Sequence, residues 1–206
     1  MHVAFSAVGP TTGVELSESL FREAGERSEY LGPREFVALA ERHAGGTDRG
    51  AEPGVPEEWL LEHVETLADE SHVEAESFRT DLAAVTTDSA AWDDDRAVYE
   101  VGEDRLSAYP PAWHEALGGT TSLPEVVRYL LDESDYRPVD AGAGDGVPED
   151  DLLDVAAAVA GFTRDGAKAA LEDCRADGRL VEDVDQHPEA NVYLPRSEHE
   201  RDASPE

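Results

Sequence analysis

Four basic side chains near the C-terminal end of the chain are spaced as neighbours on one face of a helix. Arg164, Lys168, Arg175 and Arg179 are separated by 4, 7 and 4 residues, which places them within roughly 60° of one another around a helix. Lys168 is the only lysine in the sequence. Such a row can present its charges to phosphates or to the edges of guanine bases. Alternatively, Arg164 and Lys168 pair with neighbouring carboxylates, as spaced charges on helices usually do.

Residue types with reactive or metal-binding side chains show no comparable pattern. Cys174 is the only cysteine and falls at the apolar edge of its helix, so we expect a small buried side chain rather than a nucleophile. The seven histidines lack metal-ligand spacing, and His63 and His114 are expected against tryptophans or on the surface. The segment GAGDG at 142–146 lacks the lysine and hydroxyl residue of a phosphate-binding loop. We therefore expect no catalytic residue, no metal site and no cofactor.

The elements that would position the cationic row include a duplicated segment. Nearly the same eight residues occur as GVPEEWLL from Gly54 to Leu61 and as GVPEDDLL from Gly146 to Leu153. A proline suits the first turn of a helix, and the glutamates that follow it favour the positive end of the helix dipole. Each copy therefore predicts the start of a helix in an equivalent setting.

Apolar periodicity around the two copies predicts the same order of elements twice, namely helix, loop, helix, turn, helix and hairpin. An amphipathic helix at 14–31 precedes them. We expect a mainly α fold with small β hairpins, of the α+β class. The predicted organisation is an N-terminal segment at 1–32, a first unit at 33–118, a second unit at 119–195 and a disordered charged tail at 196–206.

One stretch carries a resemblance to a known superfamily. The residues GFTRDGAKAALEDCRADGRLVEDV at 161–184, with Leu171, Cys174, Gly178 and Leu180 in that spacing, resemble the third helix and first wing strand of a winged helix-turn-helix domain. The resemblance covers 122–195 and extends through the repeat to 33–111. It implies two tandem winged-helix units, each closing its own small core. The first copy departs from the pattern, since it has no glycine directly after its third helix and a longer link at 85–97.

The resemblance also implies a role for the cationic row. In DNA-binding winged helices the third helix enters the major groove while the wing and nearby basic residues touch phosphates. The residues that this assigns to DNA contact are Thr163, Arg164, Lys168, Arg175 and Arg179. The first expectation is thus a non-enzymatic DNA-associated regulator. The alternative is an adaptor in a replication, segregation or transcription assembly that makes no direct DNA contact.

The composition is strongly acidic, with 48 acidic against 16 basic residues, a formal net charge of −32 and no isoleucine. It resembles the proteins of haloarchaea, in which carboxylates hold water and cations in molar salt and the salt screens surface repulsion. A disordered acidic chain is the alternative, but apolar residues make up 40% of the sequence and fall in periodic segments. We find no signal peptide and no membrane span in the sequence, so a cytoplasmic location is expected.

The segment between the two units is the remaining candidate for a partner site. Tyr109, Trp113 and Leu117 flank two prolines and would either cover the joint between the units or form an aromatic patch for a protein partner. The first unit and the helix at 14–31 are also expected to be available for a homodimer or another protein.

Overall fold

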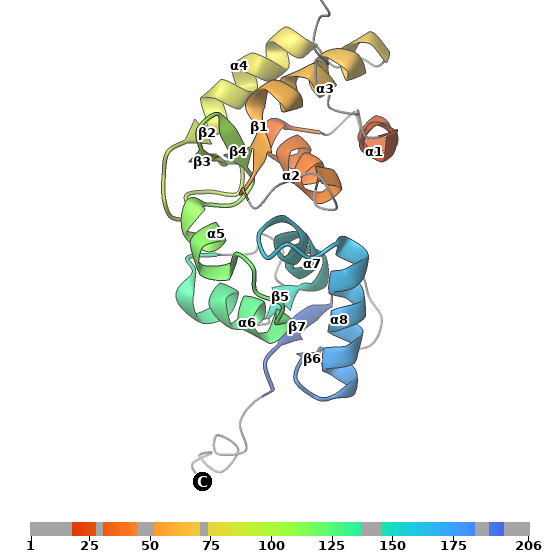
Figure 1. Cartoon of the computed structure of the whole chain (residues 1–206), viewed down its shortest axis with the longest axis vertical. Helices are drawn as coiled ribbons and strands as arrows, with labels where there is room; N and C mark the ends of the chain where they lie inside the picture. Colours follow the sequence, from red (N-terminus) through yellow and green to blue (C-terminus); the bar gives the residue numbers. More distant parts are fainter. Residues whose placement is uncertain are drawn as a thin grey trace, which may run out of the picture.

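The computed structural model describes residues 18–27, 31–44, 52–70, 74–136, 146–183 and 190–195 of the chain (Figure 1). Helices and two small sheets make up these residues, as the predicted α+β class requires. The tail at 196–206 and most of the loop at 137–146 lie outside the described residues.

The first half of the chain, which runs from α1 to the strand that ends at Ser107, begins with two helices. These are α1 (Glu18–Arg27) and α2 (Pro33–Ala44). The remaining helices are α3 (Glu57–Glu70) and α4 (Ala75–Val85). Four short strands accompany them: β1 (Val55–Pro56), β2 (Thr86–Thr87), β3 (Val98–Gly102) and β4 (Arg105–Ser107). They form one sheet in the order β1-β4-β3-β2, in which β2 runs parallel to β3 and the other pairs are antiparallel.

The second half follows the short helix α5 (Pro111–Leu117). Its first helix is α6 (Leu123–Arg128), which continues into one π-helical turn, η2 (Tyr129–Glu133). The next elements are β5 (Val147–Pro148), α7 (Glu149–Ala158) and α8 (Arg164–Ala176). A hairpin of β6 (Val181–Glu182) and β7 (Asn191–Tyr193) ends the described chain, and the sheet has the order β5-β7-β6. Helix, strand, helix, helix and hairpin therefore occur in the same order in both halves.

The duplicated octet occupies the same place in both sheets. Its Val-Pro pair forms the first strand, and in each half this strand pairs with the last strand of the hairpin. The amide of Glu57 donates to the carbonyl of Asp104 over 2.9 Å, and the amide of Glu149 donates to that of Ala190 over 2.9 Å. The helix thus starts at the glutamate, one residue later than a first-turn proline would place it. The proline ends an edge strand, where a missing N–H is tolerated.

The glycine that opens each octet is required by the close approach of this strand to the hairpin. Gly54 has φ +69°, and a β-carbon built on it would lie 2.5 Å from the carbonyl oxygen of Leu106. A β-carbon on Gly146 would lie 2.6 Å from the ring of Tyr193. Both distances are far below van der Waals contact, so the two glycines allow the strand to reach its partner.

The two halves share one continuous apolar core, which corrects the expectation of two separate cores. Buried side chains run from Leu20 in α1 through Phe36, Trp113 and Leu152 to Leu171 in α8. The halves lie one above the other in Figure 1, with α2 packed against α7. The side chain of Arg42 in α2 donates to the Asp154 carboxylate in α7 over 3.3 Å. Apolar packing and an ion pair therefore both join the halves.

The apolar face of α1 is used within the chain. Leu20 and Ala24 are buried against the core, and Arg42 of α2 donates to the carboxylate of Glu23 over 2.7 Å. These residues are accordingly not exposed for the homodimer contact expected of this helix. Residues 14–17 and 28–30 of the predicted helix lie outside the described residues.

The link at 85–97, between α4 and β3, takes part in the structure of the first half. Thr86 and Thr87 add the parallel strand β2 to the sheet, and the amide of Ala112 then donates to the carbonyl of Ala90 over 3.1 Å. Trp92 stacks on Trp113 with ring centroids 5.2 Å apart. The link therefore extends the sheet and delivers an aromatic side chain to the joint between the halves.

The close approach at Gly54 predicts a large loss of stability on replacement by alanine. We expect Gly54→Ala to lower the free energy of unfolding by about 2–4 kcal/mol, because the left-handed backbone and the missing space both penalise the β-carbon. Gly119→Ala is the matched control, since Gly119 has φ +80° but open space around it, and it should cost only about 1–2 kcal/mol. Urea unfolding followed by circular dichroism measures both; equal losses would contradict the steric explanation.

Candidate functional site

The predicted DNA-contact residues lie on one well-defined helix. α8 begins after Thr163, whose hydroxyl accepts from the amide of Gly166 over 3.0 Å and so caps the helix. It ends at Ala176; Gly178, two residues further on, has φ +69°, and the amide of Arg179 returns to the carbonyl of Cys174 over 2.8 Å. A glycine is favoured at this place because the left-handed backbone carries no penalty for a β-carbon there. Thr163 therefore has a structural role at the helix start, and Arg179 lies just beyond the helix end.

The two cations nearest the N-terminal end of α8 pair with carboxylates of α7. Arg164 donates to Asp150 over 2.6 Å and also contacts Asp154. Lys168 donates to Glu149, the residue that opens α7. Burial lowers the pKa of Arg164, and the nearby Arg42 lowers it further. The alternative expectation, that Arg164 and Lys168 pair with neighbouring carboxylates, is therefore confirmed.

The cations at the other end of the row are paired as well. Arg175 lies 2.6 Å from the carboxylate of Glu182 in β6, and Arg179 lies 3.4 Å from that of Asp177. Burial raises the pKa of the Glu182 carboxyl, and the neighbouring Glu149 raises it further, whereas Arg175 lowers it. Each member of the predicted row thus has a carboxylate partner, and these partners come from three different parts of the second half.

The row also lies on a flank of α8 rather than on its outermost face. Ala167, Leu171 and Cys174 are buried, and at about 100° per residue the positions opposite them are 165, 169, 172 and 176. These exposed positions are occupied by Asp165, Ala169, Glu172 and Ala176. The face of α8 that points away from the core therefore carries carboxylates and methyl groups but no cation.

The predicted partner-binding residues are buried, so they do not form a surface patch. The exposed fraction is 6% for Tyr109, 2% for Trp113 and 3% for Leu117. The ring of Trp113 packs edge-on against Tyr136, with centroids 5.7 Å apart. The guanidinium of Arg34 lies 5.7 Å from the centre of the Tyr109 ring, within the range of a cation–π contact. The structure places these three side chains in the joint between the halves, which confirms the first of the two expectations for them and excludes the second, an exposed aromatic patch for a partner.

The other side chains considered for chemistry are also internal. Cys174 is buried, and burial raises the pKa of its thiol, as expected for a residue that is not a nucleophile. His114 is buried and lies 2.9 Å from the hydroxyl of Ser107. Within the described ranges, no group of three or more histidine, cysteine or acidic side chains is arranged to hold a metal ion.

His63 is buried between two aromatic rings. Its ring lies 3.8 Å from that of Trp59 and 5.2 Å from that of Phe21, measured between centroids. Its Nδ1 donates to the carbonyl of Trp59 over 2.8 Å, while Nε2 has no hydrogen-bond partner among the described residues. Burial lowers the pKa of His63, although the Trp59 carbonyl and Glu62 oppose this shift. The neutral ring therefore belongs to the core.

The lowered pKa of His63 predicts a loss of stability in mild acid. The unfolded chain takes up this proton near pH 6.5, whereas the folded chain resists it until a lower pH, so the contribution is complete above 6.5 and is lost as the pH falls below it. Urea unfolding at pH 7.5 and 5.5 should show a larger drop for wild type than for His63→Phe, which keeps an aromatic ring but does not titrate. Equal drops in the two proteins would show that other groups cause the loss.

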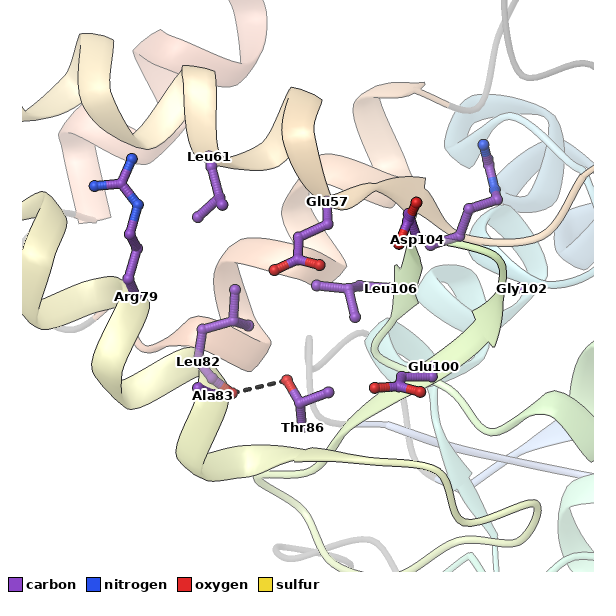
Figure 2. A pocket seen from close by; sticks show the side chains of 11 residues that line it. Glu57, Leu61, Arg79, Leu82, Ala83, Thr86, Glu100, Gly102, Asp104 and Leu106 are labelled. Atoms are coloured by element: carbon purple, nitrogen blue, oxygen red, sulfur yellow. Dashed lines mark hydrogen bonds between the residues drawn. The ribbon is translucent and has the colours of Figure 1, made fainter.

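A groove in the first half was not predicted from the sequence. It consists of two adjoining hollows of about 440 and 550 Å³ between α3, α4 and the β3–β4 hairpin; Figure 2 shows the residues that line the first of them. The residues that line both hollows are Glu57, Leu61, Arg79, Asp104 and Arg105. These residues are distant in sequence and meet only because the hairpin folds back onto β1, so no local pattern could indicate them.

The two arginines of this groove are engaged within the chain. Arg79 donates to the carboxylate of Glu65 and lies 3.8 Å from that of Glu76. Arg105 donates to the carbonyls of Pro53 and Gly54, each over 2.6 Å. Acidic residues in the groove therefore outnumber the two arginines. Both arginines make contacts within the chain that stabilise its fold.

Comparison with protein-family models, with curated proteins and with solved structures gives no match for this chain. Over the part of the chain that the structure describes, every helix is too short or too polar to cross a membrane.

Proposed function

We propose that the chain is a tandem winged-helix protein adapted to a saline cytoplasm. The support is the repeated order of three helices followed by a two-stranded wing, together with the resemblance at 161–184. The equivalent pairing of β1 with β4 and of β5 with β7 supports treating the halves as two copies of one unit. The net charge of −32 supports the saline environment.

Within that class, the geometry favours a non-catalytic adaptor that binds a protein partner and makes no DNA contact through α8. One observation carries this proposal: all four cations of the row have carboxylate partners, and the outermost face of α8 presents Asp165 and Glu172. A phosphate backbone would have to break these pairs and approach like charges. In concentrated salt, little counterion release remains to offset that cost.

The DNA-associated regulator remains the second candidate because part of the row is accessible. The side chain of Arg175 is 37% exposed and that of Arg179 is 52% exposed. An arginine in an exposed ion pair is held weakly, so a phosphate could exchange with its carboxylate partner. A surface of this kind would contact DNA at the C-terminal end of α8 and at the wing.

A binding titration separates the two candidates. We expect fluorescence anisotropy in multimolar KCl to show no binding of genomic DNA fragments tighter than about 10 μM, the range of ordinary non-specific binding. Lys168→Gln and Arg179→Gln should then leave the signal unchanged. The matched control is Arg128→Gln, which removes an exposed cation outside the row. If wild type binds and only the row variants weaken binding at least about tenfold, the regulator replaces the adaptor.

The acidic composition predicts that stability depends on salt. Reducing KCl from multimolar to 0.1 M lengthens the Debye length from about 3 Å to about 10 Å, so repulsion among the surface carboxylates grows. We expect a loss of about 3 kcal/mol, equivalent to a fall of about 10 °C in the thermal midpoint. Circular dichroism at matched pH measures the midpoint, and sucrose of equal osmolality serves as the uncharged control. A midpoint that is independent of salt would contradict the saline adaptation.

A further inference from the structure

The groove between α3, α4 and the β3–β4 hairpin combines an apolar floor with unpaired acidic walls. Leu82 and Leu106 are buried beneath the hollow of about 440 Å³, and Leu61 lines its α3 side. The groove lies on the first half, at the far end of the molecule from the β6–β7 hairpin (Figure 1). A volume of this size is at the lower end of the range for ligand sites, about 300–1,000 Å³.

Two carboxylates face this hollow without a partner in the described part of the chain. Figure 2 shows those of Glu57 and Glu100 facing it from α3 and β3. Across the described residues, neither side chain makes a hydrogen bond or an ion pair, and both residues are exposed. The adjoining hollow adds the exposed carboxylates of Glu58, Glu62 and Glu103, which make no hydrogen bond or ion pair with any residue that the structure describes. The apolar floor is therefore flanked by carboxylates that outnumber the two arginines of the groove, and those of Glu57 and Glu100 are not neutralised by any side chain among the described residues.

This combination fits a long cationic side chain. A guanidinium or ammonium group can lie between carboxylates while its aliphatic stem covers an apolar surface. An anionic ligand would be repelled, and a wholly apolar one would remove water from Glu57 and Glu100 without replacing their hydrogen bonds. A surface of carboxylates alone would be an ordinary feature of this chain, but here the carboxylates surround a hollow with Leu82 and Leu106 as its floor.

Concentrated salt favours arginine over lysine at such a site. Salt screens the attraction of a point charge, whereas a planar guanidinium keeps its directed hydrogen bonds to carboxylates. We propose that this groove binds an arginine-bearing segment of a partner protein, with the guanidinium between Glu57 and Glu100 and the stem over Leu61, Leu82 and Leu106. The proposal rests on the adaptor function above and names the chemistry of its partner.

A peptide titration of the full-length chain tests this site. The probe is the acetylated and amidated tripeptide Leu-Arg-Leu, added to isotopically labelled protein in multimolar KCl and followed by NMR. We expect concentration-dependent shifts at the amides of Glu57, Leu61, Leu82 and Glu100. The Leu-Lys-Leu peptide should bind more weakly, and Leu-Gln-Leu should give no shifts at these amides. Shifts that are equal for the three peptides, or that lie elsewhere, would overturn the proposal.

Charge-removing variants make the test specific. Glu57→Gln and Glu100→Gln should each weaken binding of the arginine peptide about tenfold, the cost of losing one charge-assisted hydrogen bond. Glu115→Gln is the matched control, since Glu115 is also exposed but lies on α5, outside the groove. Because both groove glutamates are exposed, unchanged urea unfolding should confirm that the variants fold. Equal affinity in all three variants would overturn the proposal.

Two further results would overturn either the proposed partner segment or the adaptor function. Light scattering that shows a wild-type dimer, dissociated by Glu57→Gln, would assign the groove to a second copy of the chain and overturn the partner segment. Tight DNA binding through α8 would refute the adaptor function whether or not the peptide binds. Absence of peptide binding together with absence of DNA binding would remove this inference and leave the adaptor proposal standing.

Discussion

The pairing of a two-residue strand with the end of a hairpin is the constraint on which each half depends. This pairing fixes where the following helix starts, because the first helical amide donates to the residue just before the last strand. It also fixes the hairpin over that helix. In the first half the same arrangement creates the groove, since the hairpin residues Gly102 and Asp104 form one wall, Leu106 contributes to the floor and the helices form the other walls. Gly54 and Gly146 have no β-carbon, and this allows the segments to approach each other closely.

This strand pairing leads to a different arrangement of charged side chains in each half. In the second half, the start of α7 brings Glu149 and Asp150 beside α8, so its cations are neutralised within the chain. In the first half, the one cation of α4 is Arg79, which pairs with Glu65 and Glu76. Among the described residues, the carboxylates of Glu57 and Glu100 in the groove have no cationic partner. The two halves thus present different surfaces: in the second half the cations of α8 are paired within the chain, and in the first half an acidic recess lies beside α3 and α4.

The sequence predicted the repeated elements well because their signals are local. The duplicated octet and the apolar periodicity around it each act over a few residues, whereas the capping role of Thr163, which was predicted as a DNA-contact residue, emerged only from the structure. The relations between distant segments could not be predicted in the same way. Glu182 meets Arg175 only after the wing has formed, and Trp92 enters the joint from a polar link that has no helical or strand pattern. Aromatic residues beside prolines indicated either a joint or a surface patch, and only the packing of α5 distinguishes these.

The carboxylate of Asp154 forms ion pairs with two arginines from different helices. Arg42 approaches it from α2 and Arg164 from α8, and Arg42 is only 11% exposed while the other two side chains are about one-third exposed. Arg42 also pairs with Glu23 and Arg164 also pairs with Asp150, so each arginine keeps one carboxylate if Asp154 is replaced. What such a replacement removes is the one carboxylate that links α2, α7 and α8, and with it a contact that sets the mutual orientation of the two halves.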